Sequence, residues 1–353
     1  MQIFDWIIFL LSILVFAAGG VFMVHQMFFG LNKTALNDKY VWGLNIQGFT
    51  FLSSVGMGIL AMSAIPLLVM GRQEESLWQL LGSIALGCIV CAQVLMGADL
   101  GRPFRALKIL KGKNLISPLT LDFLILFLLT ISALFLSFDF LLDYRVIRLI
   151  WAWGTMFLCF FGFIVHGLLF VPRVGSGYQS EPFSTAAFIA SGCAMGSGLM
   201  VALCWGTAME SWFTMAFSVA AAFALACGLG SVICDLLGDQ RPHQLFFTLS
   251  SLVVCGILFM DGILLPQMRI LVPIAIGISL VGGFVEKHQA VIHLQKKPIL
   301  PYPYSAFEQK ILYKPVLSEW LNLVSGVAGI VAIMYVIRIM HQYILPWIQQ
   351  LLV

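Results

Sequence analysis

Residues 42–70 read WGLNIQGFTFLSSVGMGILAMSAIPLLVM, a stretch that contains no charged side chain. A helix needs about 20 apolar residues to cross the hydrocarbon core of a bilayer. The stretch is long enough for one such helix, with the polar residues Asn45 and Gln47 near its start. It decides the fold class, because the same pattern recurs along the whole chain.

Nine further apolar runs are separated by short polar segments. They cover residues 6–29, 77–98, 118–141, 147–171, 183–205, 211–235, 244–261, 264–286 and 319–340. In hydrocarbon every backbone N–H and C=O must be satisfied internally, and runs of this length suit helices rather than the strands of a barrel. We therefore predict an all-α, polytopic integral membrane protein with about ten transmembrane helices, and a tight turn between the eighth and ninth at Asp261–Pro266.

Composition excludes a water-soluble globule. Of 353 residues, 61% are hydrophobic and 10% are charged, against about 45–50% and 25% in an ordinary soluble domain. The mean hydropathy is +1.00. A formal net charge of +3 is too small to suggest nucleic acid as a partner. The eight cysteines all fall inside apolar runs, so they form no disulfide framework.

Lysine and arginine are distributed unequally between the two ends of the predicted helices. One end carries 14 of the 19, in segments that we call the basic face: residues 30–41, 98–117, 172–182, 236–243 and 287–318. The positive-inside rule makes this face cytoplasmic and both termini external. A second interpretation stays open, in which the basic residues of 102–113 and 287–314 form a docking surface for an acidic partner.

Two short motifs recur in the second half of the chain. Ser54-Val-Gly56-Met-Gly58 resembles Ala194-Met-Gly196-Ser-Gly198, and Asp99-Leu-Gly-Arg102-Pro103 resembles Gly238-Asp-Gln-Arg241-Pro242. We therefore predict two parallel four-helix bundles related by an axis along the membrane normal. The expected organisation is a flanking helix in 1–30, a first bundle in 40–172, a second bundle in 182–286, a basic loop in 287–318, and a flanking last helix and tail in 319–353.

Polar side chains inside apolar helices are costly and mark candidate sites. Asn45, Gln47, Gln93, Asp122 and His166 are expected roughly 5–10 Å below the basic face, from the rise of 1.5 Å per residue. An amide, a carboxylate and an imidazole at one depth suit a quinone, which has two polar oxygens and an apolar tail. His166 is the best candidate for a proton-carrying donor, because imidazole exchanges a proton near neutral pH. The alternative is that His166 only packs against a neighbouring helix.

Other polar residues have weaker assignments. Asp99 and Arg102 stand three residues apart, so they either end a helix as an ion pair or tune the quinone site. In the second half, Asp235, Asp261 and Glu286 are weak candidates for a proton pathway. They stand toward helix ends with apolar residues between them.

The chain lacks the ligand patterns of a redox centre. No predicted helix has two suitably separated histidines for haem, and no cysteine cluster could hold an iron–sulfur centre. We therefore expect no haem and no iron–sulfur cluster in this chain. Electrons that reach it must be carried by a partner.

Several motifs together resemble the NrfD-like family of polysulfide reductase membrane subunits over residues 40–290. They are Lys39-Tyr-Val-Trp42-Gly43, Asp99-Leu-Gly-Arg102-Pro103, Ser117-Pro118, His166-Gly-Leu-Leu and Pro182-Phe-Ser. The additional first and last helices are similar to the ten-helix branch, which includes the membrane subunits of alternative complex III and of some uptake hydrogenases.

The resemblance implies a quinone-reactive anchor subunit of a respiratory oxidoreductase in the bacterial cytoplasmic membrane. Such subunits pass electrons between menaquinone or ubiquinone and a docked four-cluster iron–sulfur subunit, which is attached to a molybdopterin or other catalytic subunit. The chain departs from the family at two positions: His166 stands where a tyrosine is common, and Leu121-Asp122 where Trp-Gly is common. Many relatives dock the partner on the outer side, whereas the charge count places this face inside.

Two other functions remain open. A secondary transporter or proton-translocating subunit would explain the predicted repeat, but it would need charged pairs near the membrane centre in both halves. A purely structural anchor would not need Asn45, Gln47, Asp122 and His166 at one depth.

Overall fold

The computed structural model describes residues 3–37, 40–70, 75–100, 117–138, 144–170, 183–238, 242–264, 266–293, 295 and 313–345. Within these ranges the chain forms no strand and ten α-helices, which together with the helical turns that adjoin α8, α9 and α10 are long and apolar enough to span a membrane. They are α1 Ile3–Phe29, α2 Leu44–Met70, α3 Glu75–Asp99, α4 Pro118–Phe138, α5 Arg145–Leu169, α6 Ser184–Leu203, α7 Glu210–Leu237, α8 Leu245–Phe259, α9 Val272–His288 and α10 Leu317–Ile339. The predicted all-α, ten-helix membrane fold is confirmed.

The eighth and ninth helices are joined by irregular helical turns at the predicted place. A π-helical turn, η3, covers Met260–Leu264, and a 3-10 turn, η4, covers Pro266–Leu271. Pro266 has no backbone N–H and cannot continue the hydrogen-bond ladder of a preceding helix. The chain therefore changes direction between Met260 and Leu271.

The end of α9 differs from the sequence prediction. The sequence places the start of the basic loop at residue 287, but α9 continues to His288 and a π-helical turn, η5, covers Gln289–His293. Lys287 is fully buried inside this helix, so it does not belong to the charged surface of the basic face. The reason is local, because Lys287 pairs with the neighbouring Glu286 inside the bundle.

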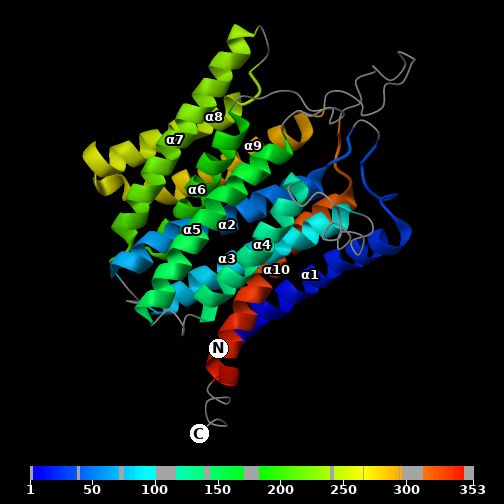
Figure 1. Ribbon diagram of the computed structural model, residues 1–353, viewed down its shortest axis with the longest axis horizontal. Coiled ribbons are helices and arrows are strands. Elements are labelled where there is room, and N and C mark those ends of the chain that lie inside the picture. The colour runs from blue at the N-terminus through cyan, green and yellow to red at the C-terminus, as the bar shows by residue number, and fades with distance from the viewer. Residues whose placement is uncertain are drawn as a thin grey trace.

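The helices contact one another in two closed rings. In the first ring α2, α3, α4 and α5 are neighbours in that order and α5 returns to α2; in the second, α6, α7, α8 and α9 do the same. The two rings meet along α2, which contacts α6 and α9, and along α5, which contacts α6. In Figure 1, α2 lies among its neighbours in the middle of the molecule, and α7 and α8 lie toward the edge away from α1. The origin of the rings in a duplication stays a prediction.

The backbones of the two rings come into contact at Gly58 of α2 and at Gly192 and Gly196 of α6. A Cβ added to Gly58 of α2 would lie 2.1 Å from the carbonyl oxygen of Gly192, and one added to Gly196 of α6 would lie 2.3 Å from the carbonyl carbon of Gly58. Only glycine permits such contact between backbones, as in other membrane helix pairs. The two similar motifs therefore supply the two sides of one helix crossing.

The first and last helices pack against each other on the outside of the first ring. In Figure 1, α1 and α10 run side by side along one edge of the molecule. α10 also contacts α3 and α2. Only 17% of the apolar window of α1 is buried, against 78% for α2, so α1 is left to face lipid and α2 forms the centre.

Candidate functional site

His166 lies in the last turn of α5 and is fully buried. Its Nε2 is 2.9 Å from the hydroxyl oxygen of Ser53 on α2, and its Nδ1 is 3.1 Å from the carbonyl oxygen of Gly162, one turn earlier. The ring stacks on Phe49 of α2, with 5.2 Å between ring centres. Both nitrogens are therefore oriented, which makes the imidazole a rigidly placed group.

Asp122 approaches the same ring from α4. Its Oδ1 lies 2.9 Å from His166 Nδ1, and neither side chain is exposed. This contact is close but not aligned as a hydrogen bond, because the Nδ1 position is aligned with Gly162. Within the described ranges, neither oxygen of Asp122 has a hydrogen-bond partner. A buried carboxylate in this state needs a proton, a cation or a further donor.

Ser53, His166 and Asp122 can hold a proton in more than one arrangement. The Ser53 hydroxyl lies 2.7 Å from the Phe49 carbonyl oxygen and 2.9 Å from His166 Nε2, but it has only one proton. If that proton goes to His166, Nδ1 is free to donate to Gly162. If it goes to the Phe49 carbonyl oxygen, His166 Nε2 donates its proton to the Ser53 oxygen. Nδ1 then has no proton of its own and faces the oxygens of Gly162 and Asp122, so a proton is needed on Asp122 or a second one on the ring.

The other predicted pocket residues point to different partners. The Gln47 side chain points toward α9 and not toward His166. Its Oε1 lies 2.9 Å from His288 Nδ1, and its Nε2 donates to the Phe284 carbonyl oxygen. Gln93 donates to Thr130 and to the Leu126 carbonyl oxygen on α4. The five residues thus stand near one end of the bundle but do not converge on one point.

Asn45 and Asp99 belong to a separate group beside α10. The Oδ1 of Asn45 lies 3.3 Å from Asn322 Nδ2, and Asp99 interacts electrostatically with Glu319. Asp99 is the last residue of α3, as its position before Arg102 and Pro103 predicts. Arg102 lies outside the described residues, so its predicted pairing with Asp99 stays a prediction.

Ser53 was missed by the sequence reasoning. A serine inside an apolar helix usually bonds to a carbonyl of its own helix, as Ser53 does to Phe49, and so gives no signal of a site. The available signal was its position four residues after Phe49 and eight after Asn45.

The second ring contains a buried ion pair that the sequence reasoning also missed. Lys287 Nζ lies 2.7 Å from Glu286 Oε2, and Ser191 on α6 contacts both groups, at 2.9 Å from the ammonium and 3.1 Å from the carboxylate. The ammonium also lies 3.5 Å from the ring centre of Phe188. Phe188 in turn lies 6.4 Å from His166, so one aromatic ring separates the charged pair from the candidate site.

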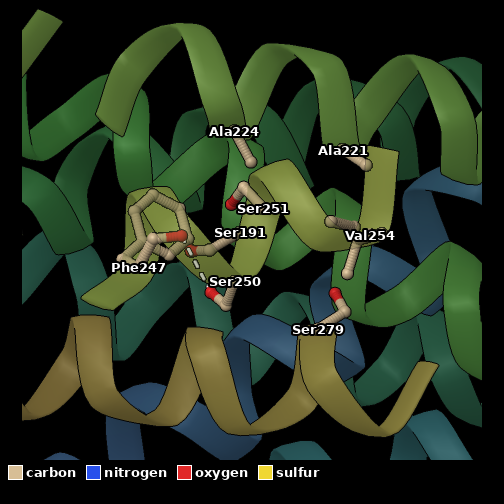
Figure 2. Close-up of a pocket in the computed structure, with 9 residues that line it drawn as sticks. Ser191, Ala221, Ala224, Phe247, Ser250, Ser251, Val254 and Ser279 are labelled. Atoms are coloured by element: carbon tan, nitrogen blue, oxygen red, sulfur yellow. Dashed lines mark hydrogen bonds between the residues drawn. The ribbon is translucent and has the colours of Figure 1, made fainter. Parts of the chain in front are cut away.

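A small cavity adjoins this pair between α6, α7, α8 and α9. Its volume is about 10 Å3, and serine hydroxyls from three helices line it together with Ala194, Ala221, Ala224, Phe247 and Val254. Figure 2 shows Ser191, Ser250, Ser251 and Ser279 around this space. A cavity of this volume holds about one water molecule when polar groups surround it.

The two remaining proton-pathway candidates, Asp235 and Asp261, lie near opposite ends of α8. Asp235, in the last turn of α7, accepts a hydrogen bond of 2.9 Å from the backbone of His243 before α8. Asp261 lies in η3 at the other end of α8. Neither contacts Glu286 among the hydrogen bonds and ion pairs of the described residues, and no metal-binding group of three His, Cys, Asp or Glu occurs there.

The fold defines a multi-pass helical membrane protein, and the site places Ser53, His166 and Asp122 together in its interior. No family model matches the chain. A protein of Halobacterium salinarum strain NRC-1, provisionally named as a membrane subunit of dimethyl sulfoxide reductase, is 26% identical over 220 residues. The alignment covers 56% of this chain and 50% of that protein, so the chain spans about half the length of the relative it matches. The chain is thus similar to a membrane subunit of an oxidoreductase, which loosely supports the resemblance found in the sequence.

Proposed function

We propose that the chain is the quinone-reactive membrane anchor of a multisubunit respiratory oxidoreductase. It would exchange electrons between membrane quinone and a docked iron–sulfur subunit. The observation that carries this proposal is the buried group of Ser53, His166 and Asp122, in which a fixed imidazole stands beside a carboxylate that has no hydrogen-bond partner within the described ranges. The name of the relative supports the oxidoreductase class.

These residues fit the chemistry of a quinone. Reduction of a quinone takes up two electrons and two protons, so its site needs donors that can also exchange protons. A quinone oxygen would accept from His166 Nε2 in place of the Ser53 hydroxyl, which can turn to Phe49, and Asp122 would return a proton to Nδ1. Phe49 and Phe188 give the ring an apolar surround that excludes water.

The cofactor and partners complete the proposal. The quinone would be menaquinone or ubiquinone, the electron carrier a four-cluster iron–sulfur subunit, and the catalytic subunit one that contains molybdopterin or another centre. The membrane would be the bacterial cytoplasmic membrane. The basic face supports an acidic partner at the end of the bundle where His166 lies.

Affinity purification from native membranes followed by photolabelling tests the proposal. The tagged chain should co-purify with an iron–sulfur protein, and an azidoquinone should label peptides of α2, α4 or α5 in a manner that excess quinone prevents. Absence of an iron–sulfur partner, or labelling that excess quinone does not prevent, would contradict it. An Asp122→Asn chain serves as the matched comparison, because it keeps the shape of the side chain and changes its proton.

One observation favours the transporter alternative. The Glu286–Lys287 pair is an intramembrane charged pair of the kind that transporters place on a substrate path. The described part of the first ring has no matching Lys–Glu pair, and the two halves of a transporter would need one each. Uptake of a labelled solute by vesicles that contain the chain without partners would favour this alternative.

A further inference from the structure

Phe188 of α6 contacts both the charged pair of the second ring and the candidate site of the first. The ammonium nitrogen of Lys287 lies 3.5 Å from the centre of the Phe188 ring, and the imidazole centre of His166 lies 6.4 Å from the same point. The ammonium is therefore no more than about 10 Å from the imidazole centre. All three side chains are fully buried, so solvent and salt screen this interaction little.

The Lys287 side chain has three partners that suit an ammonium. Its Nζ lies 2.7 Å from Glu286 Oε2, donates to the Ser191 hydroxyl at 2.9 Å and faces the Phe188 ring. A carboxylate and an aromatic face both attract a cation. A fixed positive charge therefore stands beside Phe188.

Glu286 and Lys287 leave α9 on different sides. Gly282, one turn before Glu286, packs against Ser250 of α8, where an added Cβ would lie 2.2 Å from the serine oxygen. Gly283, one turn before Lys287, packs in the same way against a side chain of α6. Residues four apart share one face of a helix. The ammonium is thus the end of the pair that lies toward α6 and the first ring.

The site in the first ring can hold one proton in two places. Either Asp122 is a carboxylic acid beside a neutral imidazole, or it is a carboxylate beside an imidazolium. The other described side chains that contact the His166 ring, those of Ser53, Phe49 and Phe188, carry no charge. The choice between the two forms therefore depends on charges further away, of which Lys287 is the one that Phe188 brings close.

Lys287 acts on the two forms unequally. The imidazole contacts Phe188, whereas Asp122 belongs to α4, whose neighbours α2, α3 and α5 are all in the first ring. The ammonium is therefore nearer to the imidazole than to the carboxyl group. It opposes a second proton on the ring more than it favours a negative charge on Asp122, and so it favours the form in which Asp122 is an acid.

The size of the effect follows from distance. A unit charge 10 Å away changes a proton equilibrium roughly 15-fold at an effective dielectric constant of about 20. The opposite charge of Glu286 cancels part of this, and the attraction between Lys287 and an ionised Asp122 cancels another part. We therefore expect a net preference of about threefold for the acid form.

We propose that Lys287 is a positioning residue for the candidate site, which keeps the shared proton on Asp122 and the imidazole of His166 neutral. The inference deepens the proposed function and rests on it for its consequence in the reaction. When Nε2 gives its proton to a quinone oxygen, the Asp122 proton replaces it at Nδ1. The imidazole then stays neutral and Asp122 becomes a carboxylate, a negative charge that the ammonium stabilises.

Infrared spectroscopy of the tagged complex, purified without quinone, tests the position of the proton. A carbonyl band of the Asp122 carboxylic acid, assigned by its loss in Asp122→Asn, is expected in the native complex. In the double variant Glu286→Gln, Lys287→Met, which leaves no unpaired charge, the ratio of acid to carboxylate should fall about threefold. Absence of the band from the native complex, or an unchanged ratio in the double variant, would overturn the proposal.

Two further variants separate charge from packing. Lys287→Arg keeps the positive charge, and Ser191→Ala removes the hydroxyl that contacts both charged groups without changing either charge. Both should keep the native ratio of acid to carboxylate. A fall in either variant as large as in the double variant would mean that packing and not charge controls the site, and would overturn the proposal.

Nitrogen-15 solid-state NMR gives an independent measure of the same proton. The His166 signals, assigned by their loss in His166→Leu, should show one protonated and one unprotonated nitrogen in the native complex, and a larger share of doubly protonated ring in the double variant. Two protonated nitrogens in the native complex would overturn the proposal. Neither spectrum requires quinone, so a failure of quinone photolabelling with these spectra as expected would contradict the proposed function alone.

Discussion

The Nδ1 atom of His166 lies 2.9 Å from Asp122 Oδ1, although the two residues come from different helices and both are fully buried. A carboxylate beside an imidazole in the membrane interior is expensive unless the two share a proton. The Ser53 hydroxyl on the other side of the ring can change its direction, so the proton can change its position without movement of the helices. This relationship is the basis of the first prediction.

Replacing His166 with leucine should leave the complex assembled and reduce quinone-coupled turnover by about 10²-fold or more, as expected for loss of a proton-carrying donor. Leucine suits the apolar surround of Phe49 and Phe188. The activity of the catalytic partner with artificial dyes should survive. Thr155→Val, which removes a buried hydroxyl from the same helix, is the matched control. Equal loss of dye-linked and quinone-linked activity would mean that His166 has a structural role.

The purified chain, stripped of its partners, should show no haem absorption and contain no iron. The physical reason is the absence from the sequence of paired axial histidines and of a cysteine cluster. Optical spectroscopy and metal analysis check this directly, with the intact complex as the positive control for iron. A Soret band that stays with the stripped chain would show the expectation to be wrong.

The ten helices and the turn at Asp261–Pro266 were predictable, because runs of apolar residues report helices in hydrocarbon regardless of how these pack. The site was predictable only in part. The sequence singled out Asp122 and His166 as intramembrane polar residues, but it could not show that Gln47 turns to α9 and Asn45 to α10, since a position on a helix gives depth and not direction. Ser53 was missed because serine is common in apolar helices. Lys287 was missed because the sequence places it at the start of a basic loop, whereas its ion pair with Glu286 is buried in α9.

Replacing Gly58 with alanine should destabilise the chain by about 1–3 kcal/mol, the usual cost of overpacking. The added Cβ would lie 2.1 Å from a backbone oxygen of α6, which cannot turn aside as a side chain can. Gly154→Ala in α5 is the matched control, because nothing lies within 4 Å of the added atom. Thermal unfolding in detergent compares the two. Equal unfolding temperatures for both variants would show that α2 and α6 do not meet at Gly58.

Replacing Lys287 with methionine should cost about 3–5 kcal/mol, because it leaves the Glu286 carboxylate buried without its cation. The double variant Glu286→Gln, Lys287→Met removes both charges and should recover most of the loss. Unfolding measurements on the two single variants and the double variant give the coupling between the residues. Additive losses would contradict a direct ion pair between Glu286 and Lys287.

Replacing Asp261 with asparagine should change neither electron transfer nor the number of protons moved per electron. Asp261 lies in the turn after α8, at the end of the bundle away from the basic face. Glu286, Lys287 and Asp235 lie in the last turns of α9 and α7, at the end of the bundle near the basic face. The small cavity between α6, α7, α8 and α9 holds about one water, too little to connect the two faces of the membrane without further movement. Charge translocation should therefore arise mainly from the side on which quinone takes up and releases protons. Liposomes containing the complex and quinone, made with the native chain and with Asp261→Asn, test this; Asp235→Asn serves as the comparison at the basic face. A variant at Asp261 that keeps electron transfer but abolishes proton movement would contradict the prediction and make the second ring a proton pump.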